Sequence, residues 1–441
     1  MSNFFRRITR SFDIFSLGNS IVTYLLAIFF VLPIGIFLGA PSRIGAWFFS
    51  TQTSALSFSG ALLVLFGLIA FILGYWFFDV FIKRKKMKIP TFSLENKWND
   101  SNVFLVFLFL FFLNLVVKGL RIYLGWYVHT NTLVSIIKNG LYSFIGILDW
   151  VGPVALCIAF GYYFFLYRNK EKKYVVWKYL AWGVFCLEFF YGFLSLSRFR
   201  AMVPILVYLI VRHYILKKSI ARVFVVGLMM LFLVIPAMNV MRSPAGFFEG
   251  YEIPSQEKTI LHVTEYIFDS AAGRIDQSRI LKNLLESHNI LSYGGVFKNL
   301  AISLTPPRIF WEEKPVINGD GNEFGRKIGI LNPEDKTTSI APTMLGDWYL
   351  NFGMLGVVGG MFFMGGLLRF IYDVLIVYSR AALSGVMIYS IVWIQVIKGM
   401  EDWIAPVYAG LVKLLVVLLA VHILLTSDFS RFAFWRRNVR Q

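Results

Sequence analysis

Charged residues are scarce in this chain. Only 15% of its 441 residues are Asp, Glu, Lys or Arg, against roughly 25% in a typical soluble domain. The two cysteines, Cys157 and Cys186, each lie inside an apolar run, which leaves no disulfide framework and no cysteine metal site. The five histidines form no His-Glu-x-x-His pattern, so the metal signal is weak. A G-x-S-x-G motif, a Gly-Lys-Ser/Thr phosphate loop and internal repeats are also absent.

Apolar runs dominate the sequence instead. Hydrophobic residues make up 57% of the chain, and several runs reach the ~20 residues that a helix needs to span a bilayer. No small-residue cleavage site follows the first run, so we expect it to remain as a span. The pattern predicts an all-α polytopic membrane protein with ten spans, at about 20–40, 55–82, 103–124, 141–166, 174–196, 201–216, 223–240, 350–371, 381–398 and 404–425.

Basic residues are grouped in short segments between the predicted spans. They occur at 6–10, in KRKKMK (83–88), in RNKEKK (168–173), in KKSIAR (217–222) and in the tail RFAFWRRNVR (431–440). With ten spans, all these segments fall on one side, which the positive-inside rule makes the cytoplasm. Both termini are therefore expected inside. The same grouping explains the formal charge of +18 without a nucleic-acid partner.

One long segment, 241–342, is predicted on the opposite side. It holds over half of the chain's 25 acidic residues and is far longer than a connector needs to be. Helical periodicity at 259–286 and Pro- and Gly-rich turns elsewhere predict a folded, helical external module that rests on the membrane. We expect three parts: a bundle of seven spans at 1–240, the external module at 241–342, and a bundle of three spans at 343–441.

Two arginines interrupt the apolar sequence YGFLSLSRFRAMVPIL at the external end of two spans. Arg198 and Arg200 are disfavoured there by the positive-inside rule and need an anionic partner. Glu188 and Tyr191 fall on the same helix face as Arg198, which makes a polar stripe that leads up to the pair. The partner is either a carboxylate of the protein, Glu188 or Asp149, with interfacial lipid phosphate as a further option, or the phosphate of a lipid substrate.

The stretch SLTPPRIFWEEKPVING (303–319) contains two cations in rigid backbone. A pair of prolines precedes Arg308, and Lys314 is followed by a further proline. This arrangement would pre-organise anion binding, and Trp311 suits a membrane interface. The alternative is a structured loop whose cations pair with the two neighbouring glutamates.

Two further motifs follow. The stretch GDGNEFGRKIG (319–329) has no preceding strand, so it is interpreted only as a turn that presents Glu323 and Arg326. Asp347 lies where the chain re-enters the membrane, and a Gly-rich span follows it, whose small residues let helices approach closely. Asp347 is either a helix-start charge or a carboxylate that contacts a sugar or acts as a general base.

The amphipathic stretch 259–286 carries acidic side chains at helical spacing. His262, Glu265, Asp269 and Asp276 fall roughly on one stripe. A solvated helix face is the simpler interpretation, and a metal site is the weaker alternative because the spacing matches no metal motif.

Together, PPRIFWEEKP, GNEFGRKIG and LGDWYLNFGMLG resemble motifs of bacterial oligosaccharide repeat-unit polymerases, the O-antigen polymerase (Wzy-type) group that includes enterobacterial common antigen polymerases. The resemblance covers roughly 185–370. It implies a fold similar to the C-type membrane glycosyltransferases and a location in the bacterial inner membrane. It also implies an active site that faces outward, where a glycan is transferred from undecaprenyl pyrophosphate to a new lipid-linked unit. No cofactor is implied, and a chain-length regulator protein is an expected partner.

The resemblance also gives the candidate residues their roles. A lipid pyrophosphate leaving group needs positioned cations, for which the candidates are Arg198, Arg200, Arg274, Arg308, Lys314 and Arg326. Transfer to a sugar hydroxyl needs a base, for which the candidates are Asp347, Glu323, Asp269, Glu265 and His262. Sugar faces would stack on Trp311, Trp348 and Tyr349, or these rings belong to the interfacial aromatic belt.

Three rival functions share some of these features. An O-antigen ligase uses the same donor with a different acceptor, and the sequence separates it poorly from a polymerase. A flippase of lipid-linked oligosaccharides would show internal repeats and broken spans around a midplane site. A membrane acyltransferase would favour a buried histidine in a span, whereas His213 and His422 lie near the predicted cytoplasmic ends.

Overall fold

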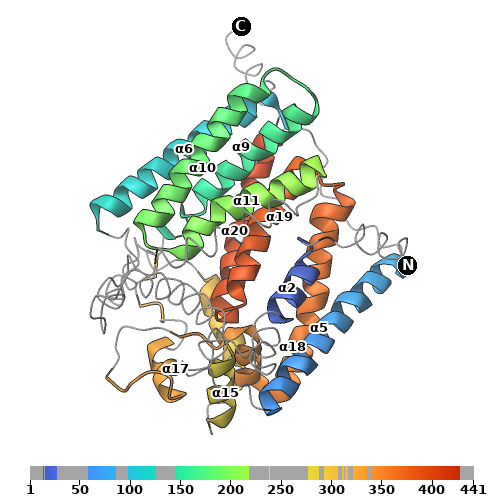
Figure 1. Cartoon of the computed structure of the whole chain (residues 1–441), viewed down its shortest axis with the longest axis vertical. Coiled ribbons are helices and arrows are strands. Elements are labelled where there is room, and N and C mark those ends of the chain that lie inside the picture. The colour runs from blue at the N-terminus through green and yellow to red at the C-terminus, as the bar shows by residue number, and fades with distance from the viewer. Residues whose placement is uncertain are drawn as a thin grey trace, which may run out of the picture.

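The structure is a computed structural model, and the elements that it describes are helices (Figure 1). The structure describes residues 13, 15–26, 58–85, 98–125, 145–146, 148–217, 238, 277–287, 293–305, 310–311, 313–315, 321–334 and 340–427. Within these ranges there is no β-strand, which confirms the predicted all-α class for this part of the chain.

Six helices among the described residues are long and apolar enough to cross a membrane. They are Ser59–Phe81, Asp100–Tyr123, Val151–Arg168, Arg198–Leu216, Thr343–Tyr378 and Ile404–Thr426. Two more predicted spans correspond to helix α10 (Tyr174–Leu194), which carries Lys178 and Glu188, and to the shorter helix α19 (Leu383–Gly399). Of the first predicted span only α2 (Leu17–Leu26) is described, and the predicted span at 223–240 lies outside the described residues except for Met238.

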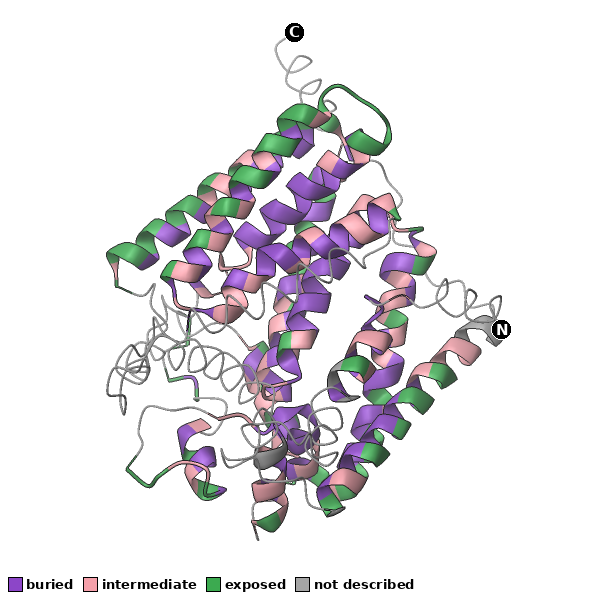
Figure 2. Cartoon of the chain, viewed as in Figure 1, coloured by how far each residue is buried: buried purple, intermediate pink, exposed green. Residues whose placement is uncertain are grey.

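Helix α9 (Val151–Arg168) forms the centre of a four-helix group with α6 (Asp100–Tyr123), α10 and α11 (Arg198–Leu216), and it also packs against α19. The apolar part of α9 is 78% buried, against 39% for α6. One face of α6 is exposed (Figure 2), and the exposed residues include Phe and Leu, which suit a lipid environment. The span predicted at 141–166 is not one continuous helix. A turn at Asp149 and Trp150 interrupts it before α9 begins.

Helices α5 (Phe58–Lys85) and α18 (Thr343–Tyr372) form a second, tightly packed pair. Glycines allow their backbones to touch: a Cβ on Gly365 would lie 2.1 Å from Phe71 O, and one on Gly74 would lie 1.9 Å from Phe362 O. The Gly-rich sequence after Asp347 thus provides the close approach that small residues permit between membrane helices.

Helix α18 begins at Thr343, seven residues before the predicted start of its span. Its backbone breaks at Phe352 and at Gly353, which has φ 61° and ψ −148°, a region open essentially to glycine alone. Asp347 therefore lies in a short first segment rather than at a simple helix start. After the break the helix continues into a π-helical turn, η2 (Asp373–Tyr378).

The ends of the helices gather at two opposite ends of the molecule. At one end, Asn99 N donates to Leu425 O at 2.9 Å and Lys173 pairs with Asp100 at 3.4 Å, which brings together the start of α6, the α9–α10 turn and the end of α20 (Ile404–Thr426). Near the other end lie the short helices α15 (Ser278–Glu286), α16 (Gly295–Leu304) and α17 (Gly321–Lys327) (Figure 1).

Candidate functional site

A basic cluster lies where α6 and α10 end and α9 and α11 begin. It consists of the cations Lys118, Arg121 and Arg200 and the carboxylates Asp149 and Glu188. Arg121 Nη2 and Arg200 Nη2 both donate to Asp149 Oδ2, at 2.7 and 2.8 Å. Lys118 Nζ pairs with Glu188 Oε1. The cluster thus joins α6, α10, α11 and the turn before α9.

Helix α6 contributes one polar stripe to this cluster. Asn114, Lys118 and Arg121 have the spacing i, i+4, i+7, which places them on one helix face, and all three are buried. Asn114 Nδ2 donates to Glu188 Oε1 at 2.7 Å. Gly152 of α9 leaves space for the Glu188 carboxylate, because a Cβ at position 152 would lie 2.2 Å from Glu188 Oε1.

Arg200 lies in the first turn of α11. Ser197 is the N-cap residue, and its Oγ accepts a hydrogen bond from Arg200 N at 3.4 Å. The positive end of a helix dipole disfavours a cation by about 0.3–1 kcal/mol, so Asp149 compensates for an unfavourable position. Of the partners considered from the sequence, Arg200 takes Asp149, whereas Glu188 pairs with Lys118.

Access to the cluster is graded. The side chains of Arg200 and Asp149 are 27% and 24% exposed, whereas those of Lys118 and Arg121 are 9% and 2% exposed. The cluster is therefore accessible to solvent at Arg200 and Asp149 and is buried at Lys118 and Arg121. Three cations face two carboxylates, and a buried ion pair is stable only when charge and hydrogen bonds are well compensated. A further anion with several acceptor oxygens, such as a phosphoryl group, would balance this charge.

The α19–α20 connection, residues 400–403, joins the basic cluster to the first segment of α18. Just before it, Lys398 Nζ lies 5.3 Å from the centre of the Phe199 ring, beside Arg200. Met344 N donates to Met400 O at 3.1 Å. The Trp403 ring packs edge-on against Phe324 of α17, 5.3 Å away. The first turn of α11, the start of α18 and α17 thus all lie beside the end of α19 and the connection that follows it.

Asp347 is buried, and both its carboxylate oxygens accept hydrogen bonds. Oδ2 accepts from Ile404 N, the first residue of α20, at 2.8 Å, and Oδ1 accepts from Asn351 Nδ2 at 3.0 Å. Asn351 Oδ1 in turn accepts from Val296 N at the start of α16, at 2.8 Å. Asp347 and Asn351 therefore hold the starts of α20 and α16 against α18.

The three described candidates of the predicted external module, Lys314, Glu323 and Arg326, form other contacts. Lys314 is buried, and its Nζ donates to Thr305 O at 3.1 Å. Arg326 Nη1 donates to Pro333 O at 3.3 Å. Glu323 forms an exposed pair with Lys327 at 2.7 Å, and the hydrogen bond from Lys327 lowers the pKa of the Glu323 carboxyl. A lower pKa makes a carboxylate a weaker base.

The predicted aromatic residues differ in their surroundings. Trp311 is 40% exposed. Trp348 packs against the glycine face of its own helix, since a Cβ on Gly360 would meet the indole at 2.2 Å, and Tyr349 packs partly buried on the same core. Five predicted site residues lie outside the described residues: His262, Glu265, Asp269, Arg274 and Arg308.

Sequence reasoning missed Lys118 and Arg121 as members of the site. The signal was present, because two cations one helical turn apart interrupt a strongly apolar span and such residues are functional candidates by default. Among the residues that the structure describes, no group of His, Cys, Asp and Glu is arranged to hold a metal ion.

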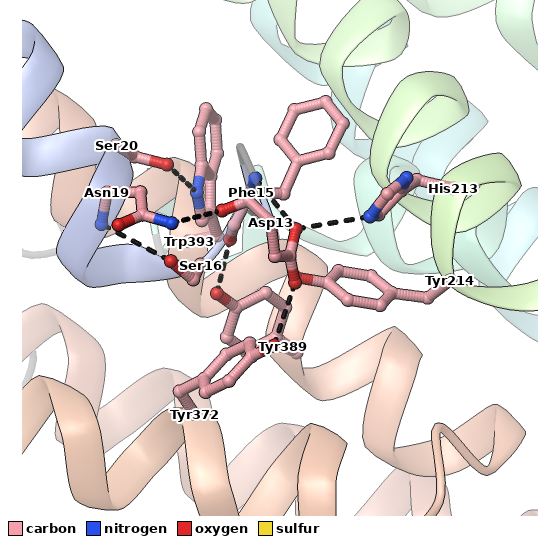
Figure 3. Close-up of polar contacts among 10 residues, drawn as sticks. All are labelled: Asp13, Phe15, Ser16, Asn19, Ser20, His213, Tyr214, Tyr372, Tyr389 and Trp393. Carbon is pink, nitrogen blue, oxygen red and sulfur yellow. Dashed lines mark hydrogen bonds and ion pairs between the residues drawn. The ribbon is translucent and has the colours of Figure 1, made fainter. Parts of the chain in front are cut away.

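A second polar cluster surrounds Asp13 (Figure 3). Asp13 Oδ1 lies 3.1 Å from His213 Nε2, and the hydroxyls of Tyr214 and Tyr372 donate to Oδ2 at 2.8 Å each. Burial raises the pKa of the Asp13 carboxyl, but these three hydrogen bonds and the charge of His213 outweigh burial and hold the pKa below its usual value. The carboxylate joins the ends of α11 and α18.

The segment after Asp13 is held by α19. Trp393 Nε1 donates to Ser20 Oγ at 3.0 Å, and the Tyr389 hydroxyl donates to Phe15 O. Figure 3 shows these side chains converging on the segment from three helices. The hydrogen bonds of this cluster therefore hold Asp13, Phe15 and Ser20 against α11, α18 and α19.

Comparison with known proteins adds one finding. Residues 325–419 match the model of a family described as "Putative O-antigen polymerase". The matched stretch runs from α17 through α18 and α19 into α20 and includes Asp347, whereas the basic cluster lies outside it. No curated protein and no solved structure matches the chain. The chain thus matches the O-antigen polymerase family over residues 325–419, which confirms the resemblance predicted from its sequence.

Proposed function

We propose that this membrane protein polymerises oligosaccharide repeat units carried on undecaprenyl pyrophosphate. The growing glycan is the donor, and a sugar hydroxyl of a new lipid-linked unit is the acceptor. The observation that carries the proposal is the family match at 325–419 in a chain with six long apolar helices. The basic cluster supports it independently, because its cations can bind a phosphoryl group and lie where α6 and α10 end and α9 and α11 begin.

The proposed topology places this end of the molecule outside the cytoplasm. The α9–α10 turn, the start of α6 and the end of α20 meet at the opposite end, and their flanking segments carry the basic runs at 83–88, 168–173 and 431–440. This grouping supports a cytoplasmic location for both termini in the bacterial inner membrane. The division at 240 and 342 into two bundles and an external module, and a C-type glycosyltransferase fold, are part of the same proposal.

In the proposed reaction, the acceptor hydroxyl oxygen attacks the anomeric carbon of the donor. A new C–O bond forms while the C–O bond to pyrophosphate breaks, and the electron pair leaves with undecaprenyl pyrophosphate. Arg200, at the open side of the cluster, binds the phosphoryl oxygens, and Lys118 and Arg121 add positive potential behind it. The hydroxyl proton passes to a base, for which Asp347, Glu323, Asp269, Glu265 and His262 are the candidates.

Arg198, Arg274, Arg308, Lys314 and Arg326 complete the proposed set of phosphate-binding cations. Trp311, Trp348 and Tyr349 are the proposed sugar-contacting rings. Trp311 is the most accessible of the three, so a substrate sugar reaches it with the least rearrangement.

The test is polymerisation by purified protein given only its lipid-linked repeat unit. Wild type should produce a glycan ladder on a gel. Arg200→Ala should reduce the rate at least tenfold, because one charge-assisted contact to the leaving group contributes about 1.5–3 kcal/mol. Lys172→Ala is the matched control, since Lys172 is an exposed cation in the α9–α10 turn, and it should leave the ladder unchanged.

Two other outcomes would replace the proposal. Transfer to a different acceptor, with no ladder from the repeat unit alone, would identify a ligase. Movement of intact lipid-linked oligosaccharide across vesicles without new glycosidic bonds would identify a flippase. An unaffected ladder in Arg200→Ala would keep the polymerase and remove Arg200 from the substrate site.

A further inference from the structure

The side chain of Tyr191 is the unexplained member of the basic cluster. It is 7% exposed, and its ring lies 4.7 Å from Lys118 Nζ and 5.8 Å from Arg200 Cζ, measured to the ring centre. Both distances are within the range of cation–π contacts. The ring therefore has a clear role, because it separates and holds two cations of the cluster.

The residues that the structure describes do not explain the hydroxyl of Tyr191 in the same way. It is buried, and its proton has no acceptor among the described residues. Buried hydroxyls are nearly always hydrogen-bonded, and an orphaned one is costly. A phenylalanine would provide the same ring without this cost, so packing alone does not account for a tyrosine at this position.

The charges around Tyr191 indicate what kind of partner it lacks. Lys and Arg side chains are hydrogen-bond donors only, so the cations cannot accept the hydroxyl proton. The two carboxylates of the cluster are already engaged, Asp149 by two arginines and Glu188 by Lys118 and Asn114. The cluster thus lacks an acceptor at the hydroxyl and lacks one negative charge overall. A phosphoryl group supplies both.

We propose that the Tyr191 hydroxyl donates a hydrogen bond to a phosphoryl oxygen held by Arg200 and Lys118, and that Tyr191 is therefore a substrate-binding residue. The assignment of that phosphoryl group to the lipid pyrophosphate rests on the proposed function. The cluster chemistry alone fits either the pyrophosphate of a substrate or the headgroup of an anionic membrane phospholipid.

The test compares Tyr191→Phe with Tyr179→Phe, a matched control on the exposed side of the same helix. Tyr191→Phe keeps the ring and removes only the hydroxyl. It should melt at the same temperature as wild type or slightly higher. It should nevertheless show about a tenfold lower kcat/KM in the ladder assay, the effect of one hydrogen bond to a charged group. Tyr179→Phe should change neither quantity.

A second measurement uses inorganic pyrophosphate as the probe in a thermal-shift titration in detergent. Pyrophosphate should stabilise wild type and should stabilise Tyr191→Phe at an apparent Kd about tenfold higher. The other source of a phosphoryl group is the headgroup of an anionic phospholipid. It is tested by the melting temperature in nanodiscs that contain phosphatidylglycerol in place of phosphatidylcholine. If Tyr191→Phe changes stabilisation by phosphatidylglycerol and leaves the pyrophosphate titration unchanged, the substrate role is overturned.

The remaining outcomes separate this inference from the proposed function. A lower melting temperature of Tyr191→Phe with unchanged kcat/KM would show a structural hydroxyl and overturn the inference. If wild type forms no ladder, the proposed function fails, and the pyrophosphate titration alone then decides whether Tyr191 binds a phosphoryl group.

Discussion

Asp347 offers the clearest way to separate a chemical role from a structural one. Its carboxylate accepts hydrogen bonds from Ile404 N at 2.8 Å and from Asn351 Nδ2 at 3.0 Å, and Asn351 Oδ1 accepts from Val296 N at 2.8 Å. Asp347 is 3% exposed. We therefore expect Asp347 to position α20 and α16, a contribution that experiment can separate from its candidate role as the base.

Replacement of Asp347 by alanine removes the acceptor of Ile404 N in a buried place. A hydrogen bond to a charged group contributes about 1.5–3 kcal/mol, and an unsatisfied buried donor costs about 1–3 kcal/mol. Asn351 Nδ2 keeps its second acceptor, Asp347 O, at 2.7 Å, so its loss is partial. We expect Asp347→Ala to reduce the free energy of unfolding by about 3 kcal/mol, which corresponds to a melting temperature lower by roughly 3 °C.

A double exchange, Asp347→Asn with Asn351→Asp, keeps three of the four hydrogen bonds and loses the one from side chain 351 to the carbonyl oxygen of residue 347, because a carboxylate cannot donate. The amide oxygen at position 347 accepts from Ile404 N, and the amide nitrogen there donates to the new carboxylate at position 351. The other oxygen of that carboxylate accepts from Val296 N. Position 347 then has no carboxylate. If the role is positioning, the exchange should restore part of the melting temperature and part of the ladder formation that Asp347→Ala loses.

The opposite result would refute this reasoning. If the double exchange melts like wild type but forms no polymer, the carboxylate of Asp347 itself takes part in the reaction. The same conclusion follows if Asp347→Ala abolishes polymerisation without changing the melting temperature.

Two further changes test the contact between α5 and α18 and the hydrogen bonds of Asp13. Gly365→Ala should lower the melting temperature by about 1–3 °C, because the new Cβ would lie 2.1 Å from Phe71 O and overpacking costs about 1–3 kcal/mol. Gly359→Ala, whose new Cβ would meet nothing within 4 Å, is the control, and equal melting temperatures of the two variants would contradict the close helix contact. Asp13→Asn should melt lower than wild type at pH 7. Because the folded pKa of Asp13 is depressed, its stabilisation is present above the unfolded pKa of about 3.9 and is lost as pH falls further, so the difference between the two proteins should narrow below about pH 4; a constant difference across pH would contradict it.

The helical architecture could largely be predicted from the sequence, because membrane spans are specified by long apolar runs. Helices α5, α6, α11 and α20 begin and end within a few residues of their predicted bounds. The break of α18 at Gly353 and the turn at Asp149 were not predicted. Both occur inside apolar sequence, where hydropathy carries no information on local backbone conformation.

The candidate site could be predicted only in part. The arginine pair was recognised because two charges at an external helix end contradict the positive-inside rule. Its partners come from elements far apart in the chain: Asp149 lies 51 residues before Arg200, and Arg121 lies on an earlier helix still. Hydrogen bonds such as Asp347 to Ile404 likewise depend on how helices meet, which periodicity and composition do not encode.

The most direct test of the whole account is the stoichiometry of a single reaction. Purified protein would be given a single kind of lipid-linked repeat unit as its substrate. The amounts of free undecaprenyl pyrophosphate and of new glycosidic linkages would both be measured over time. The account predicts a ladder in which one lipid pyrophosphate is released for each linkage formed, with both rates falling together in Arg200→Ala. Linkage formation without release of lipid pyrophosphate, or release without any linkage, would contradict it.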